Sequence, residues 1–172
     1  MLEAIDYSSR RGVIVPMMDM IYDLIAENIE KDKQAGFPPL ENKIIWKQRF
    51  RVALMEIERR WVFVMEGKLT TALLFYRFSG GDKLFIDELM VAWPYRNNKM
   101  IFPMLLDKFR FDDAVKKYSA IYAGERVRVE ENAEILAAAG FKGEYENGYQ
   151  LLGSLPEAVD ALKMRYTGRS AK

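Results

Sequence analysis

The stretch that decides the fold is residues 86–106, IDELMVAWPYRNNKMIFPMLL. Its aliphatic first half predicts a strand, Pro94 marks a turn, Arg96 opens a loop, and the second half has the spacing of an amphipathic helix. The first amide groups of a helix have no partners inside it, so a joint between a strand and a helix can hold an anion. The rest of the sequence offers no other joint so suited to a phosphorylated ligand.

The segments on either side of this stretch predict a sheet. Residues 61–66, 69–78 and 84–92 are rich in β-branched and aromatic residues and are separated by short turn sequences, and 120–123 is a fourth short strand. Strands joined by tight turns are antiparallel, whereas a strand–helix–strand joint implies a parallel crossover. The fold class is therefore α/β (α+β), with a mixed, mostly antiparallel central sheet flanked by helices.

Hydrophobic periodicity predicts the remaining elements. They are a strand over 2–7, a helix that follows Pro16 and ends at Gly36, a helix over about 42–57 with an apolar stripe of Trp46, Phe50, Ala53 and Ile57, a helix over 99–118, a short helix over 130–139, a hairpin over 141–152, a helix over 156–166 and a polar tail over 167–172. We expect one domain over residues 1–172, because no linker divides the chain.

Composition limits the class of function. Half of the 172 residues are hydrophobic, and 26 basic residues against 25 acidic ones leave a net charge of +1. Such a balance gives no general attraction to nucleic acid or to an anionic membrane. The first residues lack the pattern of a signal peptide, and no apolar run approaches the ~20 residues that cross a bilayer. We expect a cytoplasmic protein that partners neither nucleic acid nor membrane.

The chain contains no cysteine and no histidine. This excludes disulfides, thiolate nucleophiles, imidazole bases and the zinc sites built on these residues. We expect no metal, and acid–base chemistry must come from groups such as carboxylates, lysine or tyrosine. Asp87 and Glu88 are adjacent carboxylates in the strand expected over 84–92, and alternation along a strand predicts that they face opposite sides of the sheet. A salt-bridged, purely structural role for both is the competing interpretation.

Two motifs in this order resemble the GCN5-related N-acetyltransferase (GNAT) family. Residues 89–91, followed by the loop to Arg96 and by a helix, resemble the family's fourth strand and acyl-CoA loop; residues 138–141, Ala-Ala-Gly-Phe, resemble the end of its fourth helix. The element order matches over about 13–153, most strongly over 60–153. The resemblance implies an N-acyltransferase that moves an acetyl group from acetyl-CoA to an amine, with Glu88 or Asp87 as the base. The amine acceptor could be a small molecule or a protein, and a homodimer is left open.

The resemblance also implies a binding site for the donor. The pantetheine arm would lie in a gap between the fourth and fifth strands, beside main-chain groups of residues 89–91, and the pyrophosphate would meet the loop over 96–101. These expected cofactor-binding residues are Leu89, Met90, Val91, Arg96, Asn97, Asn98, Lys99, Met100 and Ile101.

The sequence departs from the family pattern at several positions. Lys99 and Ile101 occupy the two positions at which the family has small residues, and Pro103 follows in the early helix. Leu136 and Val129 stand where many members have a tyrosine acid and an asparagine. These departures support an alternative function, a catalytically inactive GNAT-like module for binding or for structure.

Overall fold

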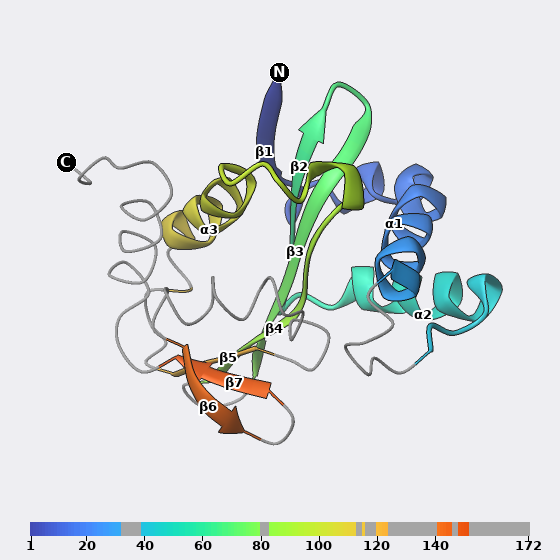
Figure 1. The fold of residues 1–172 in the computed structure, drawn as a ribbon. Helices are drawn as coiled ribbons and strands as arrows, with labels where there is room; N and C mark the ends of the chain where they lie inside the picture. The colour runs from blue at the N-terminus through green and yellow to red at the C-terminus, as the bar shows by residue number, and fades with distance from the viewer. Residues whose placement is uncertain are drawn as a thin grey trace.

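The chain forms one mixed sheet of seven strands with helices on its two faces (Figure 1). The computed structural model describes residues 1–31, 39–79, 83–112, 115, 120–123, 141–145 and 148–151. The helices expected over 130–139 and 156–166, the tail over 167–172, Leu136 and Val129 lie outside the described residues.

The strand order in the sheet is β1-β2-β3-β4-β5-β7-β6. The strands are β1 (Leu2–Asp6), β2 (Arg59–Glu66), β3 (Leu69–Ser79), β4 (Lys83–Val91), β5 (Ala120–Ala123), β6 (Phe141–Tyr145) and β7 (Gly148–Leu151). Neighbouring strands are antiparallel except β4 and β5, which run parallel. The expected mixed, mostly antiparallel sheet is confirmed.

The helices divide between the two faces of the sheet. They are η1 (Arg11–Val13), η2 (Val15–Met17), α1 (Met18–Lys31), α2 (Lys43–Met55), η4 (Trp93–Tyr95) and α3 (Ile101–Phe111). Alternating strand residues build two cores: Val62, Leu74 and Leu89 pack with α3, whereas Phe63, Leu73 and Met90 pack with α1 and α2. Figure 1 shows α3 on one side of the strands and α1 and α2 on the other.

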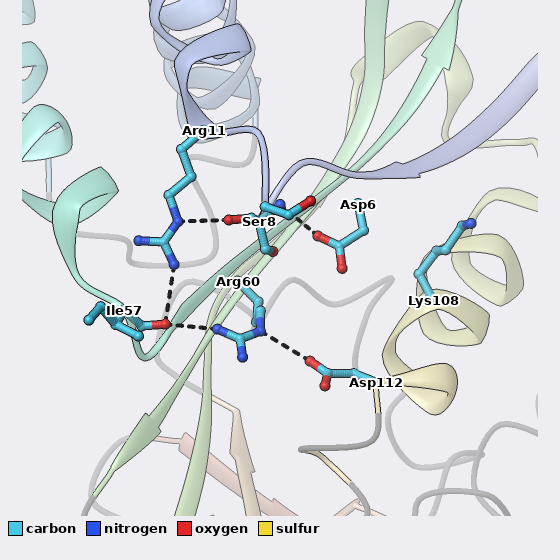
Figure 2. A pocket seen from close by; sticks show the side chains of 8 residues that line it. Asp6, Ser8, Arg11, Ile57, Arg60, Lys108 and Asp112 are labelled. Carbon is cyan, nitrogen blue, oxygen red and sulfur yellow. Dashed lines mark hydrogen bonds and ion pairs between the residues drawn. The ribbon is translucent and has the colours of Figure 1, made fainter.

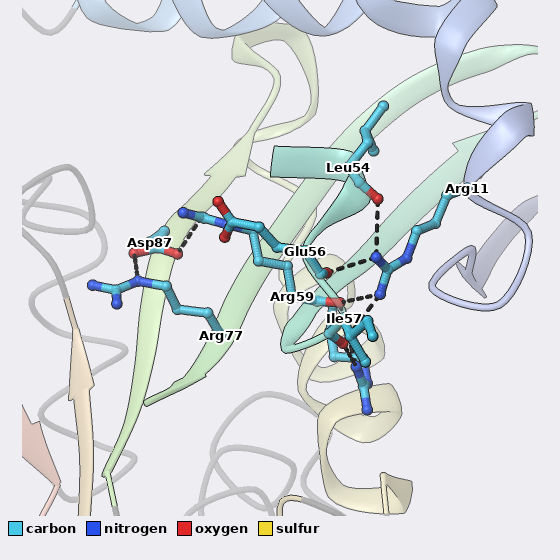
Figure 3. Close-up of polar contacts among 8 residues, drawn as sticks. Arg11, Leu54, Glu56, Ile57, Arg59, Arg77 and Asp87 are labelled. Carbon is cyan, nitrogen blue, oxygen red and sulfur yellow. Dashed lines mark hydrogen bonds and ion pairs between the residues drawn. The ribbon is translucent and has the colours of Figure 1, made fainter. Parts of the chain in front are cut away.

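Helix α2 is held at both ends by side chains. At its start the Asn42 side chain accepts a hydrogen bond from the Ile44 amide at 2.9 Å. At its end the Arg11 guanidinium donates to the carbonyl of Leu54, in the last turn of the helix, and to carbonyls of the segment that follows (Figure 3). These acceptors are the carbonyls of Leu54, Glu56, Ile57 and Arg59, at 2.6–3.2 Å, with Ser8 as a fifth.

The prediction that Ile57 lies in the apolar stripe of this helix is wrong. Helix α2 ends at Met55 and the backbone of Glu56 is extended, so Ile57 follows the helix and is 79% exposed. Leu54, which is 5% exposed, occupies the inner face at the end of the helix instead. In the described part of the chain, no helix is long and apolar enough to cross a bilayer.

Candidate functional site

The described part of β5 pairs with only the first residues of β4. The register pairs Lys83 with Ala120 and continues to Ile86 with Ala123, the last residue of β5. Residues 87–91 of β4 extend beyond this point, and within the described strands nothing pairs with them on the β5 side. The last five residues of β4 therefore extend past the described part of β5.

The register identifies the groups on this edge. The Ala92 amide donates to the Thr71 carbonyl of β3 at 2.8 Å, so this pair is hydrogen-bonded. Hydrogen-bonded and non-hydrogen-bonded pairs alternate along antiparallel strands. The Met90 N–H and C=O therefore point toward β3, whereas those of Leu89 and Val91 point away from β3, on the side where the donor's pantetheine arm was expected.

A β-bulge changes where the two candidate carboxylates lie. Phe75 of β3 lies opposite Glu88, but the next residue, Tyr76, lies opposite Ile86, so Asp87 is the extra residue on β4. Ile86 and Leu89, three positions apart, both pack in the core beside α3. Glu88 shares the face of Phe75, which packs with α1 and α2.

Asp87 lies on this same face, because both of its oxygens contact arginines there. Arg59 Nη1 lies 3.0 Å from Asp87 Oδ2, and Arg77 Nε lies 3.1 Å from Oδ1 (Figure 3). The expectation that Asp87 and Glu88 face opposite sides of the sheet is therefore wrong, since the bulge interrupts the alternation of the strand. Because both oxygens are engaged by guanidinium groups, a substrate could reach Asp87 only by displacing one of these contacts. Burial raises the pKa of Asp87, and Arg77 and Arg59 oppose that shift.

The arginines belong to a row of side chains that crosses four strands. Arg59, Arg77, Phe85 and Tyr122 are successive register partners on β2, β3, β4 and β5. The Arg77 guanidinium lies 4.7 Å from the centre of the Phe85 ring, and the Phe85 and Tyr122 rings stack at 5.1 Å. These contacts tie β5 to β4 immediately before the gap begins.

The loop over 96–101 was expected to present its amides to a pyrophosphate. Most of these amides instead donate hydrogen bonds within the loop or to the turn before it. The Arg96 amide donates to the Trp93 carbonyl, and the Asn98 amide to that of Tyr95. The Met100 amide donates to Asn98 Oδ1 at 3.1 Å, and the Ile101 amide to the Asn98 carbonyl at 3.2 Å. Four of the six loop amides therefore already donate hydrogen bonds. The positively charged side chains of the loop are Arg96 and the exposed Lys99.

The start of α3 explains two departures from the family pattern. The helix begins at Ile101, so Pro103 occupies its third position, in the first turn, where an N–H has no partner within the helix. The Ile101 side chain is 0% exposed and packs in the core with Leu105 and Phe109. A large side chain at 101 therefore fills the core between α3 and the sheet and is not directed into the loop.

Sequence reasoning missed Asn28 of α1. This side chain is 2% exposed, and its Nδ2 donates to the Val91 carbonyl at 2.9 Å, on the gap side of β4. Its Oδ1 is buried without a hydrogen-bond partner in the described part of the chain. Burying an acceptor without a donor lowers the stability of the folded state by about 1–3 kcal/mol. The sequence could have indicated this residue by its spacing, because Asn28 is a polar residue on the same helix face as Ile21 and Ile25, which are buried.

A separate hollow of about 720 Å³ lies between the end of β1, the start of β2 and the end of α3 (Figure 2). Its charged groups largely bind one another or the backbone: Arg60 Nε lies 3.3 Å from Asp112, and Arg11 donates to carbonyls. None of the sequence-predicted site residues lines it. We therefore locate the candidate site at the β4 edge.

Comparison with known proteins identifies the fold. No family model and no curated protein matches the sequence. Among solved structures, a GNAT-family acetyltransferase from Staphylococcus aureus Mu50 aligns with 88% of this chain and 98% of its own, at TM-score 0.67 and 12% identity. The PaiA N-acetyltransferase from Thermoplasma acidophilum, in complex with coenzyme A, aligns over 87% and 96%, at TM-score 0.67 and 10% identity.

A third structure, described as a predicted acetyltransferase from Clostridium acetobutylicum with acetyl-CoA, aligns over 85% of this chain and 93% of its own, at TM-score 0.59 and 13% identity. The chain therefore has the GNAT fold. At these identities the likeness establishes the fold, and the chemistry of this chain must be argued from its own residues.

Proposed function

We propose that this chain is an N-acyltransferase that binds acyl-CoA, with acetyl-CoA as the expected donor, and transfers the acyl group to an amine. One observation carries the proposal: β4 continues for five residues past its pairing with the described part of β5, and the backbone groups of Val91, at its end, point away from β3 on that side. An extended amide-containing chain can hydrogen-bond to such an edge as an added strand would.

The residues of the gap suit the pantetheine arm of the donor better than its phosphates. Val91 would supply a backbone N–H that points away from β3. At the other end, Arg96 and Lys99 would supply positive charge in place of the amides that the loop uses internally.

In the reaction, the carboxylate that faces the acceptor removes a proton from its ammonium group. We assign this role to Glu88, because both oxygens of Asp87 are held by arginines. The free amine then attacks the thioester carbonyl, forming a C–N bond and breaking the C–S bond, and the thiolate takes up a proton. A backbone N–H on the β4 edge would stabilise the developing oxyanion.

The second candidate function is a non-catalytic module of the same fold. The arginine contacts of Asp87 and the internally bonded loop favour it, since they remove one candidate base and most of the phosphate-binding amides. Binding of CoA without turnover would support this candidate.

Two measurements separate these functions. Acetyl-CoA at 1 mM should raise the melting temperature of the full chain, because a ligand of the native state stabilises it. With an acceptor found by screening amines, Glu88→Gln should lower kcat/KM by about 100-fold while leaving the Kd for CoA unchanged. If acetyl-CoA does not raise the melting temperature, the proposal fails; if Glu88→Gln retains full turnover, the assigned base is wrong.

A further inference from the structure

Helix α2 is apolar on two opposite faces. Its inner face, with Trp46, Phe50 and Leu54, packs in the core beside the sheet. Its outer face carries four further large aliphatic side chains that are 49–80% exposed, although the solvent-facing positions of a surface helix are normally polar. These side chains are Ile44, Ile45, Val52 and Met55.

The spacing of these side chains places them in one stripe. Ile44, Gln48, Val52 and Met55 follow one another at intervals of four, four and three residues, and Ile45 lies seven residues before Val52. Residues at such intervals lie on the same side of a helix. We call these five residues the outer stripe. Contiguous exposed apolar patches, unlike single apolar residues, are typical of interaction surfaces.

The charged residues of α2 are all basic. The helix contains no aspartate or glutamate between residues 43 and 55. Lys43 and Lys47 turn toward α1, where they contact Asp19 and Asp23 at 2.9–3.3 Å. The charges of these two lysines are therefore balanced within the chain, and the two arginines of the helix remain.

The two arginines border the outer stripe on opposite margins. Arg49 lies four residues after Ile45, and Arg51 lies four residues before Met55. The Arg49 side chain contacts Glu41 but is still 74% exposed, whereas Arg51 is exposed and makes no ion pair with any residue that the structure describes. The outer stripe is therefore an apolar surface with positively charged margins.

We propose that the outer stripe of α2 is a docking surface for an amphipathic helix of a partner protein, and that carboxylates border the apolar face of that helix. The stripe runs the length of α2, about three turns, and the side chains of a second helix pack between such rows. Carboxylates of the partner pair with Arg51 and Arg49, because complementary charges set the orientation of a contact. The docking surface does not depend on the proposed acyltransferase activity.

A second copy of the chain and a membrane fit the outer stripe less well. The same surface of a second copy would bring arginines and no carboxylate of α2 against Arg51, and like charges across an interface oppose association. Recognition of an anionic membrane takes clusters of about four to eight basic residues, whereas two arginines border the stripe. The partner that matches both the apolar centre and the charged margins is an acidic amphipathic helix.

Fluorescence anisotropy with two labelled model peptides of about 18 residues tests the proposal. Both peptides have leucine at heptad positions a and d; the acidic peptide has glutamate at positions e and g, and the basic peptide has lysine there. At low salt the wild-type chain should bind the acidic peptide at least about tenfold more tightly than the basic one, and high salt should reduce this ratio. Equal affinities, or no binding of the acidic peptide at about 1 mM, would overturn the proposal.

Substitutions on the stripe identify the surface that binds the peptide. Val52→Ser removes an apolar side chain and should weaken binding of the acidic peptide about tenfold. The matched control is Leu69→Ser, which changes a 58% exposed leucine at the start of β3 and should leave the affinity unchanged. Arg51→Glu should abolish the preference for the acidic peptide. If Leu69→Ser weakened binding as much as Val52→Ser, the stripe would not be the surface.

The altered positions of α2 are exposed, so the melting temperatures of Val52→Ser and Arg51→Glu should stay close to that of the wild type. Ile44→Ser is a second variant of the stripe if Val52→Ser does not fold.

Two further measurements detect the other occupants. A dimer in sedimentation equilibrium that Val52→Ser dissociates would show that a second copy covers the stripe. Binding to phosphatidylglycerol vesicles that Val52→Ser abolishes would show that a membrane covers it. Either result would overturn the assignment of an acidic helix.

Discussion

The end of β4 and the loop before α3 are adjacent in sequence but differ in how their backbone groups are used. Residues 87–91 of β4 extend past the described pairing with β5, and the Val91 N–H points away from β3. In the loop, four of six amides donate to other atoms of η4 and the loop. Under the proposed function, the end of β4 would therefore hold the extended arm of the donor, whereas the loop would have few amides left for the phosphates.

The largest expected effect concerns Ile101, whose side chain makes the loop differ from the family pattern. Because it is 0% exposed in the α3 core, Ile101→Ala should lower the free energy of unfolding by about 2–4 kcal/mol. Urea unfolding followed by tryptophan fluorescence measures this. The neighbouring Met100, 46% exposed, gives the control, and Met100→Ala should change the value by less than about 0.5 kcal/mol. Equal losses of unfolding free energy at the two positions would show that Ile101 does not stabilise the core beside α3.

The next effect distinguishes the two carboxylates of β4. Asp87→Asn leaves Arg59 and Arg77 without their shared partner and should cost about 1–2 kcal/mol of stability, since the side chain is 29% exposed. Thermal unfolding at neutral pH measures it. Glu88→Gln keeps the arginine pairs and should cost less. If Asp87→Asn abolished turnover without changing stability, Asp87 would be the base and the assignment to Glu88 would be contradicted.

The smallest effect sharpens the contrast at the phosphate end. Lys99→Gln removes an exposed charge and should weaken CoA binding by about threefold at low salt, with no change for pantetheine, which lacks the nucleotide. The difference should disappear at high salt. Lys68→Gln, at the exposed β2–β3 turn, is a charge-matched control that should change neither affinity. A loss of pantetheine affinity in Lys99→Gln would place this lysine in the gap instead of at the phosphates.

Much of the sheet could be predicted because its signals are local. The turn at Gly67, which has φ +60°, separates two strands whose composition is clearly β, and the crossover from β4 to β5 follows from the intervening helix. The end of α2 could not be predicted in the same way. Arg11, 43 residues earlier than Leu54, caps that helix, and no local pattern connects the two.

The candidate site was less predictable than the sheet, for specific reasons. The bulge at Asp87 depends on the register between β3 and β4, so the sequence of β4 alone implied the wrong faces for the two carboxylates. Asn28 looks like an ordinary polar helix residue until its contact with Val91, 63 positions away, is known. The helix start at Ile101 depends on core packing, which turns an apparently misplaced Pro103 into a tolerated first-turn residue.

The central claim is that the β4 edge, and not the loop, carries the affinity for the donor. Calorimetric Kd values of the wild-type chain for CoA, pantetheine and adenosine 3′,5′-bisphosphate test it most directly. We predict that pantetheine binds within about tenfold of CoA and that the bisphosphate binds at least about 100-fold more weakly than CoA. Tight binding of the bisphosphate with weak binding of pantetheine would contradict the account, as would the absence of binding by all three ligands.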